Sequence, residues 1–144
     1  MEHTQSRSAA STAPATAKAE STTLVRVFAA AMGALILIQG FLGGRGFFIS
    51  PKLLDAHEMV GSLTWLVAAG QVAVVFFTIK RRERAMLLGM SIAVLVLTTI
   101  QMGLGFSAKD GSGESAAWHL FNAVLLTGAI AAYANTVFFR LKSR

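Results

Sequence analysis

Four uncharged apolar runs constrain the folding of this chain more than any other feature of its sequence. They cover residues 27–44, 59–79, 85–108 and 115–139. Each run has about the 18 to 20 residues that an α-helix needs to cross the hydrocarbon core of a bilayer. A helix also satisfies its backbone polar groups within one segment, as a bilayer demands. The sequence therefore predicts an all-α, integral membrane four-helix bundle with short connections.

Composition agrees with a membrane protein. Hydrophobic residues make up 54% of the chain and charged residues only 14%, whereas soluble domains carry about 25% charged residues. We expect one transmembrane domain over residues 24–140, with helices at about 24–44, 57–79, 85–106 and 116–139.

The first 23 residues are mostly Ser, Thr and Ala, a composition that buries too little apolar surface to fold. We expect residues 1–23 to form a disordered cytoplasmic tail. A cleavable signal peptide is the competing interpretation, but the run at 27–44 is long for one and we expect it to be retained. The absence of cysteine excludes a disulfide framework and a thiolate metal site.

The net charge of +6 is concentrated at predicted helix ends, in KRRER at 80–84 and RLKSR at 140–144. By the positive-inside rule these segments face the cytoplasm. The sequence thus predicts that both termini are cytoplasmic in a multi-pass protein of a bacterial cytoplasmic (inner) membrane. These clusters anchor the helices, so we expect no nucleic-acid partner.

The chain repeats itself at an offset of 62 residues. At this offset Gln39 aligns with Gln101 and His57 aligns with His119, and the basic segments that follow also align. Basic stops are common to helical hairpins, so the rare Gln and His matches carry the argument. They predict two parallel-repeat helical hairpins, with all four polar residues at one depth near the outer face.

Two histidines that open the second and fourth helices can face each other across a bundle. Such a pair suits axial ligation of one haem iron, so we expect His57 and His119 to be the metal ligands. Each is equally compatible with a histidine wetted at the membrane interface. The third histidine, His3, lies in the tail and needs no role.

Small residues accompany both histidines. Gly61 and Ala123 each lie four residues after a histidine, where a flat ring has room, and we count both among the cofactor-binding residues. Close helix packing or helix capping explains the glycines of the first and third helices at least as well. These glycines are Gly43, Gly44, Gly103 and Gly105.

Other polar residues extend the candidate site. Gln39 and Gln101 are expected to donate hydrogen bonds to a ligand, or equally to join two helices. Asn122 lies on the face of His119 and has the same two interpretations. Arg45, on the outer side, is expected to pair with a haem propionate.

The motif QGFLGG followed by AHEMVG, and then QMGLGF followed by AWHLFNA, resembles one four-helix half of the heme A synthase family. The resemblance covers about residues 24–140. Short four-helix bacterial membrane proteins of unassigned function look similar too. The family has two such halves, each with one histidine from its second helix and one from its fourth, so the resemblance implies haem ligation by His57 and His119.

Two departures separate this chain from the catalytic half of that family. The family has a glutamate three residues before the first histidine and an arginine directly after it, whereas this chain has Leu54 and Glu58 there. We therefore name no catalytic residue and lean against an enzyme.

These observations lead to two functional hypotheses. The first is a small integral membrane haem-binding protein, cytochrome b-like and half the size of heme A synthase, that holds haem b and transfers electrons. Its expected partners are the lipid bilayer, a quinol or another redox partner, and a second copy in a homodimer. The second is a haem-free accessory or structural membrane protein of a larger complex. A zinc or copper site and a small transporter are disfavoured by the two-nitrogen ligand set and by the lack of charge in mid-membrane.

Overall fold

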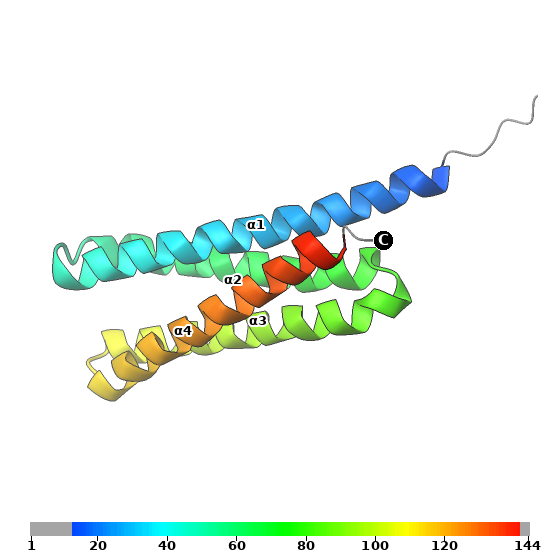
Figure 1. Ribbon diagram of the computed structural model, residues 1–144. Coiled ribbons are helices and arrows are strands. Elements are labelled where there is room, and N and C mark those ends of the chain that lie inside the picture. Colours follow the sequence, from blue (N-terminus) through cyan, green and yellow to red (C-terminus); the bar gives the residue numbers. More distant parts are fainter. Residues whose placement is uncertain (1–12, 142–144) are drawn as a thin grey trace, which may run out of the picture.

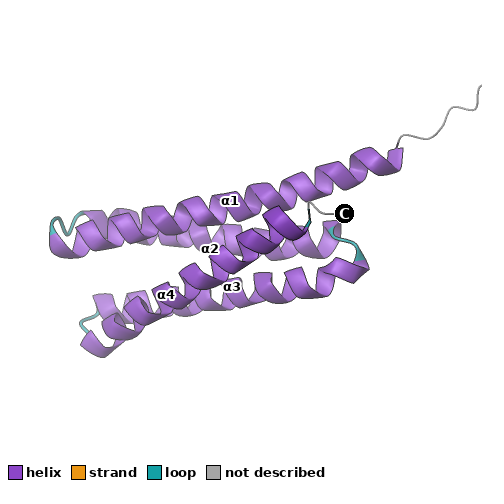
Figure 2. Cartoon of the chain, in the orientation of Figure 1, coloured by secondary structure: helices purple, strands orange, loops and turns teal. Residues whose placement is uncertain are grey.

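The computed structural model describes the backbone of residues 13–141 and the side chains of residues 22–80 and 83–141. This part of the chain forms no strand (Figure 2). Its elements are α1 (Ala13–Phe48), α2 (Leu53–Thr78), α3 (Arg81–Lys109), α4 (Gly113–Asn135) and one π-helical turn, η1 (Thr136–Arg140). The predicted all-α class with four helices is confirmed. All four helices are long and apolar enough to cross a membrane, which indicates a multi-pass membrane protein.

The helices form two hairpins, α1–α2 and α3–α4, that lie side by side (Figure 1). Each helix packs against two neighbours in the cyclic order α1, α2, α3, α4. In the described part of the chain, no Cα atom of α2 lies within 8 Å of one of α4. α2 and α4 are therefore diagonal partners, and only side chains can bridge the space between them.

The bundle has two different ends (Figure 1). The α1–α2 and α3–α4 connections lie at one end, which we call the hairpin-loop end. The start of α1 and η1 lie at the other, which we call the terminal end. In Figure 1, α4 crosses toward α1 at the terminal end, whereas the two hairpins are spread apart at the hairpin-loop end.

Two of the three connections have a clear local cause. Gly111 has a φ of 99°, a conformation that costs glycine little, and it reverses the chain between α3 and α4. Ser112 then caps α4 by accepting a hydrogen bond from the backbone N–H of Ser115 at 3.2 Å. Between α2 and α3, Ile79 and Lys80 are extended and interrupt the helix.

The core is a narrow apolar stripe along the bundle axis. One buried cluster contains Val25, Val75 and Leu87, and a second contains Met32 and Leu126. About half of the large apolar side chains in the described part of the chain are exposed, including several phenylalanines and leucines that are more than half exposed. Hydrocarbon around the helices removes the cost of exposing them, so this surface is compatible with contact with a bilayer.

The helices are longer than the apolar runs predict. α1 begins at Ala13 rather than near residue 24, so the helix covers residues 13–23 of the segment for which we expect a tail. Residues 1–12 lie outside the described residues. The segment is rich in alanine, the best helix former, and its proline falls in the first turn, where the missing N–H costs nothing. α3 begins at Arg81 for a related reason, since Arg and Glu are also good helix formers.

Candidate functional site

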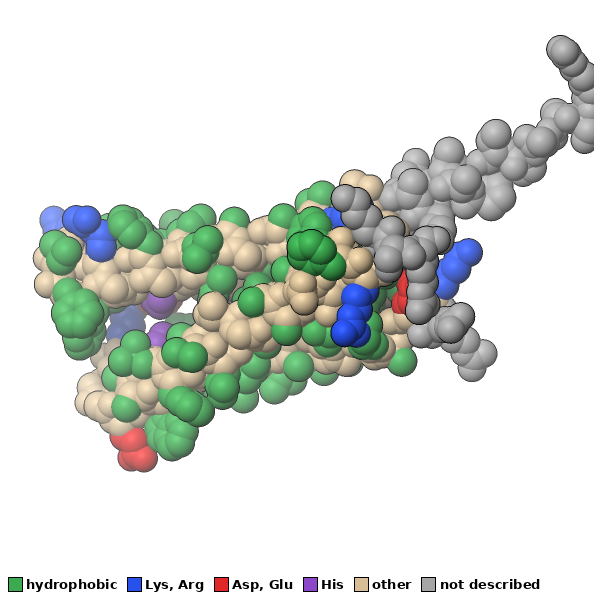
Figure 3. Space-filling model, viewed as in Figure 1, with side chains coloured by type: hydrophobic (Ala, Val, Ile, Leu, Met, Phe, Trp, Pro, Cys, Tyr) green, Lys and Arg blue, Asp and Glu red, His purple; other side chains and the backbone are tan. Residues whose placement is uncertain are grey.

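His57 and His119 meet across the diagonal of the bundle. Their ring centroids are 6.0 Å apart and their planes are inclined by 69°. Both rings are half-buried. Figure 3 shows histidine side chains on both sides of an opening between the two hairpins at the hairpin-loop end. The sequence predicted that these residues open their helices, but each lies in the second turn, because α2 begins at Leu53 and α4 at Gly113.

Both imidazoles are held by the same backbone contact. Nδ1 of His57 lies 3.2 Å from the carbonyl oxygen of Gln39, and Nδ1 of His119 lies 3.0 Å from the carbonyl oxygen of Gln101. A carbonyl can only accept, so Nδ1 carries the proton and donates it. The neutral tautomer then leaves Nε2 with its lone pair, as a metal ligand requires.

Two glycines make room for the rings. A Cβ atom added to Gly43 would lie 3.1 Å from Cε1 of His57, and one added to Gly105 would lie 3.2 Å from Cε1 of His119. Gly44 and Gly103 face open space instead. Of the four glycines noted in the sequence, the two that contact the imidazoles are equivalent in the repeat.

Gln39 joins α1 to α2 through its side-chain amide and its backbone carbonyl. Its side-chain Nε2 donates to the carbonyl oxygen of His57 at 2.8 Å, while its own carbonyl oxygen accepts from the His57 ring. The side chain is 9% exposed. Gly61, which the sequence assigned to the cofactor, lies below this contact, since its added Cβ would be 3.5 Å from Nε2 of Gln39.

Gln101 makes a different contact in the second hairpin. Its Oε1 accepts a hydrogen bond from Nδ2 of Asn122 at 2.6 Å, and the same nitrogen donates to the carbonyl oxygen of Leu97 at 2.9 Å. Asn122 therefore positions Gln101, whose backbone holds His119. Both glutamines make the interhelical bonds that were one of their two predicted roles; donation to a ligand stays a prediction.

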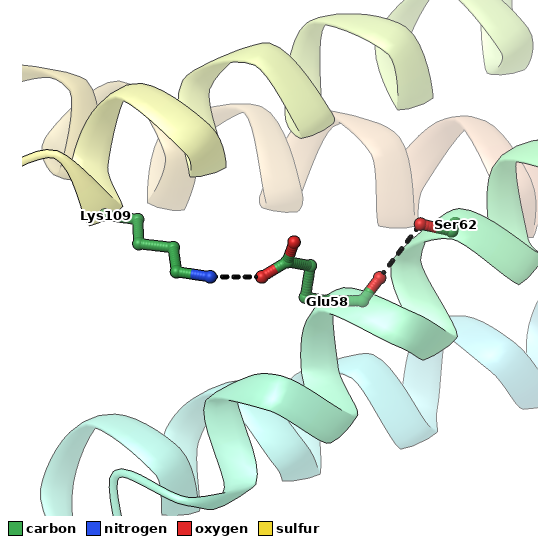
Figure 4. Close-up of polar contacts among 3 residues, drawn as sticks. All are labelled: Glu58, Ser62 and Lys109. Atoms are coloured by element: carbon green, nitrogen blue, oxygen red, sulfur yellow. Dashed lines mark hydrogen bonds and ion pairs between the residues drawn. The ribbon is translucent and has the colours of Figure 1, made fainter.

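Polar contacts join the hairpins along α2 and α3. Lys109 at the end of α3 donates to Oε2 of Glu58 at 2.6 Å, and Ser62 donates to the backbone carbonyl of Glu58 (Figure 4). Nearer the middle of the same face, Nε1 of Trp65 donates to Oγ1 of Thr99 at 3.0 Å. Contacts between charged or polar side chains thus connect the two hairpins on this side of the histidine pair.

The remaining predicted residues lie around the pair. Ala123 lines a shallow groove of about 340 Å³ on α4 together with Leu120, Val124 and Thr127. Arg45 is exposed, and its Cζ atom lies 5.6 Å from the centroid of the Phe41 ring. The assignment of these residues to a cofactor stays a prediction.

Leu54 occupies the position of the acid in the resembled family, and it has a packing role. A Cβ atom added to Gly46 of α1 would lie 2.6 Å from Cδ2 of Leu54, so this side chain fills the space left by a glycine. Glu58, at the arginine position of the family, is engaged by Lys109.

The sequence interpretation missed two polar residues in the core. Gln71 in α2 and Tyr133 in α4 are each 1% exposed. Neither amide atom of Gln71 has a hydrogen-bond partner among the described residues, and the Tyr133 hydroxyl lies near Ser91 without a hydrogen bond of standard geometry. These residues also align at the offset of 62, which is the signal that could have revealed them.

Comparison with protein-family models, curated proteins and solved structures gives no match. The fold and the site alone therefore define the class: a bundle of four helices of membrane-spanning length, with two histidines facing each other from diagonal helices. In the described part of the chain, no group of three or more His, Cys, Asp or Glu side chains is placed to hold a metal ion.

Proposed function

We propose that this protein is an integral membrane haem protein in which His57 and His119 are the two axial ligands of one haem b, and that it transfers electrons. The observation that carries the proposal is the pair of imidazoles facing each other at 6.0 Å. Each has its Nδ1 proton bound by a backbone carbonyl.

The donor set fits a metal held between two rings. A metal–imidazole bond is about 2.0–2.1 Å long, and each nitrogen lies roughly 1.1 Å from the centre of its ring. Two imidazoles that held one iron between them would have centroids roughly 6 Å apart, and the separation of His57 and His119 matches this. Gly43 and Gly105 support the proposal because any larger residue at these positions would push the rings from their places.

A haem held by two histidines supplies one-electron redox chemistry. The chain contributes orientation, since the Gln39 and Gln101 carbonyls fix the tautomer and the direction of each ring. Buried Thr64, Thr98 and Asn122 lie on α2, α3 and α4 between the rings and the apolar cluster around Met32 and Leu126. If His57 and His119 both bound the iron, oxygen activation would be disfavoured, and Leu54 provides no acid for catalysis.

The proposal includes the orientation in the membrane. By the positive-inside rule, the basic segments at 80–84 and 140–144 support a cytoplasmic location for the terminal end of both parallel hairpins. The histidine pair then lies near the outer face of a bacterial inner membrane. Its electron partner is a quinol or a second redox protein, and a homodimer would restore an eight-helix body.

A specific observation favours a second candidate, a haem-free accessory protein. The Gln39, Gln101 and Asn122 side chains all bond to protein atoms. A bundle stabilised by these contacts can serve as a rigid partner for other membrane helices without any cofactor.

The test is a reduced-minus-oxidised absorption spectrum of the full chain, purified from cells supplied with haem. We expect the bands of a six-coordinate low-spin b-type haem. His57→Ala and His119→Ala are each expected to abolish the low-spin signal, and His3→Ala serves as the control with an unchanged spectrum. A folded wild-type protein without haem bands contradicts the proposal.

The accessory hypothesis predicts a different outcome. His57→Leu and Gln39→Leu would then stay folded and still co-purify with the partners of the wild type. Loss of the haem spectrum together with loss of partner binding in His57→Leu would argue against that hypothesis.

A further inference from the structure

A groove at the terminal end of the bundle lies far from the histidine pair. It has a volume of about 580 Å³ and is bordered by Arg26 of α1 and by the last turns of α4 and η1, through Ala134, Asn135, Phe138 and Phe139. Two of the five lining residues belong to the π-helical turn η1, and such turns are frequent at functional sites. The groove therefore combines one cation with an apolar wall.

The Arg26 guanidinium has an unsatisfied hydrogen-bond donor. Its Nε atom is buried and has no hydrogen-bond partner among the described residues. A guanidinium stays protonated in proteins, and a buried donor without an acceptor is costly. Phosphate is a favourable acceptor, because its oxygens match the fork of donors on the guanidinium and carry the opposite charge.

The depth of the groove matches the level of lipid phosphates. Arg26 lies near the start of the candidate span Thr22–Phe48, and the two phenylalanines lie at the end of the span Gly113–Arg140. Both are therefore close to a membrane interface, where arginine extends its head group toward the lipid phosphates. Phe139 is 72% exposed and presents an apolar surface beside the cation.

We propose that this groove binds one anionic glycerophospholipid. The Arg26 guanidinium binds the phosphodiester, the Asn135 amide lies beside the glycerol of the head group, and the acyl chain runs along Phe138 and Phe139. A lipid is favoured over free phosphate because the groove continues from the cation into apolar side chains. A net anionic head group is favoured over a zwitterionic one because the groove contributes a positive charge and no carboxylate.

The experiment is native mass spectrometry of the full chain, released from nanodiscs that contain equal amounts of phosphatidylglycerol and phosphatidylcholine. The expected result is one retained phosphatidylglycerol per chain. Arg26→Gln is expected to lower this retention about tenfold, the loss typical of one charge-assisted hydrogen bond. Lys52→Gln, an exposed cation at the hairpin-loop end, is the control and should retain the lipid. Far-UV circular dichroism checks the fold of each variant.

A second variant keeps the test independent of any folding defect at Arg26. Phe139→Ala is expected to lower retention about fivefold through lost apolar contact. Its repeat counterpart Phe77→Ala, which is equally exposed but lies on α2, should have no effect.

Three results would overturn the proposal. The first is equal retention of the two lipids by the wild type. The second is unchanged retention in folded Arg26→Gln. The third is displacement of the lipid by millimolar glycerol phosphate, which would show that a soluble phosphate is sufficient. None of these results depends on whether the chain binds haem.

Discussion

The two hairpins hold their histidines in the same way but secure their helices differently. In both copies a glycine faces the imidazole, and the backbone carbonyl of a glutamine accepts the hydrogen bond from Nδ1. The glutamine side chains differ: Gln39 bonds directly to the His57 backbone, whereas Gln101 bonds to Asn122. The features common to both copies orient the rings, and the features that differ stabilise helix packing. The contacts common to both copies are therefore the ones on which the haem proposal depends.

The difference between the copies has a simple origin in the sequence. The counterpart of Asn122 in the first hairpin is Val60, and a valine cannot bond to a glutamine. The Gln39 side chain instead donates to the His57 carbonyl on α2. One substitution between the copies accounts for both arrangements.

The largest effect is expected from filling the space beside the rings. Gly43→Val and Gly105→Val should each lower haem affinity about tenfold to a hundredfold, because overpacking costs about 1–3 kcal/mol. Haem titration followed by absorbance measures this loss. The controls Gly44→Val and Gly103→Val face open space and should bind normally. A loss in only one hairpin would show that the two rings are not equivalent.

A second comparison concerns the two buried polar residues of the core. Gln71→Leu should raise the free energy of unfolding by about 1–3 kcal/mol, since it removes two unsatisfied amide atoms from the core. Tyr133→Phe, its repeat counterpart, removes only one hydroxyl and should give a smaller gain. Unfolding by sodium dodecyl sulfate in mixed micelles provides the measurement. Destabilisation by Gln71→Leu would contradict the absence of a partner for this amide.

A third comparison gives one residue of the second hairpin the identity of its counterpart in the first hairpin. Asn122→Val should destabilise the protein by about 0.5–2 kcal/mol, because hydrogen bonds between membrane helices have about this strength. The same unfolding assay applies. Gln39→Leu should cost a similar amount in the first hairpin. A much larger effect at either position would mean that the side chain contacts more than its helix neighbour.

The smallest effect is expected at the ion pair. Glu58→Gln should leave the unfolding transition unchanged at physiological salt, since both side chains are well exposed and exposed pairs contribute little. The counterpart of Glu58 is Leu120, so Leu120→Gln is the matched control. A clear loss of stability in Glu58→Gln alone would show that this pair holds the hairpins together.

The sequence predicted the helices and the repeat because both depend on patterns along the chain. Uncharged runs of about 20 residues define spanning helices, and the rare glutamines and histidines mark the repeat. Helix ends were less accurate, since charged residues such as Arg81 continue a helix beyond its apolar run.

Contacts between distant segments could not be predicted in the same way. Gly43 and Gly44 are adjacent, yet only Gly43 faces His57, and this depends on the rotation of α1 about its axis. The pairing of Glu58 with Lys109 depends on which helices are neighbours. Gln71 and Tyr133 align at the repeat offset. Because the two residue types differ, the alignment alone does not mark them as equivalent.

The polar contacts between the hairpins have one mechanical consequence. Glu58–Lys109 and Trp65–Thr99 both lie along the interface between α2 and α3, so the two hairpins are joined along this edge. Separation of the two hairpins at the α1–α4 edge breaks neither contact. A flat molecule could thus enter between the hairpins from that edge while both α2–α3 contacts are kept.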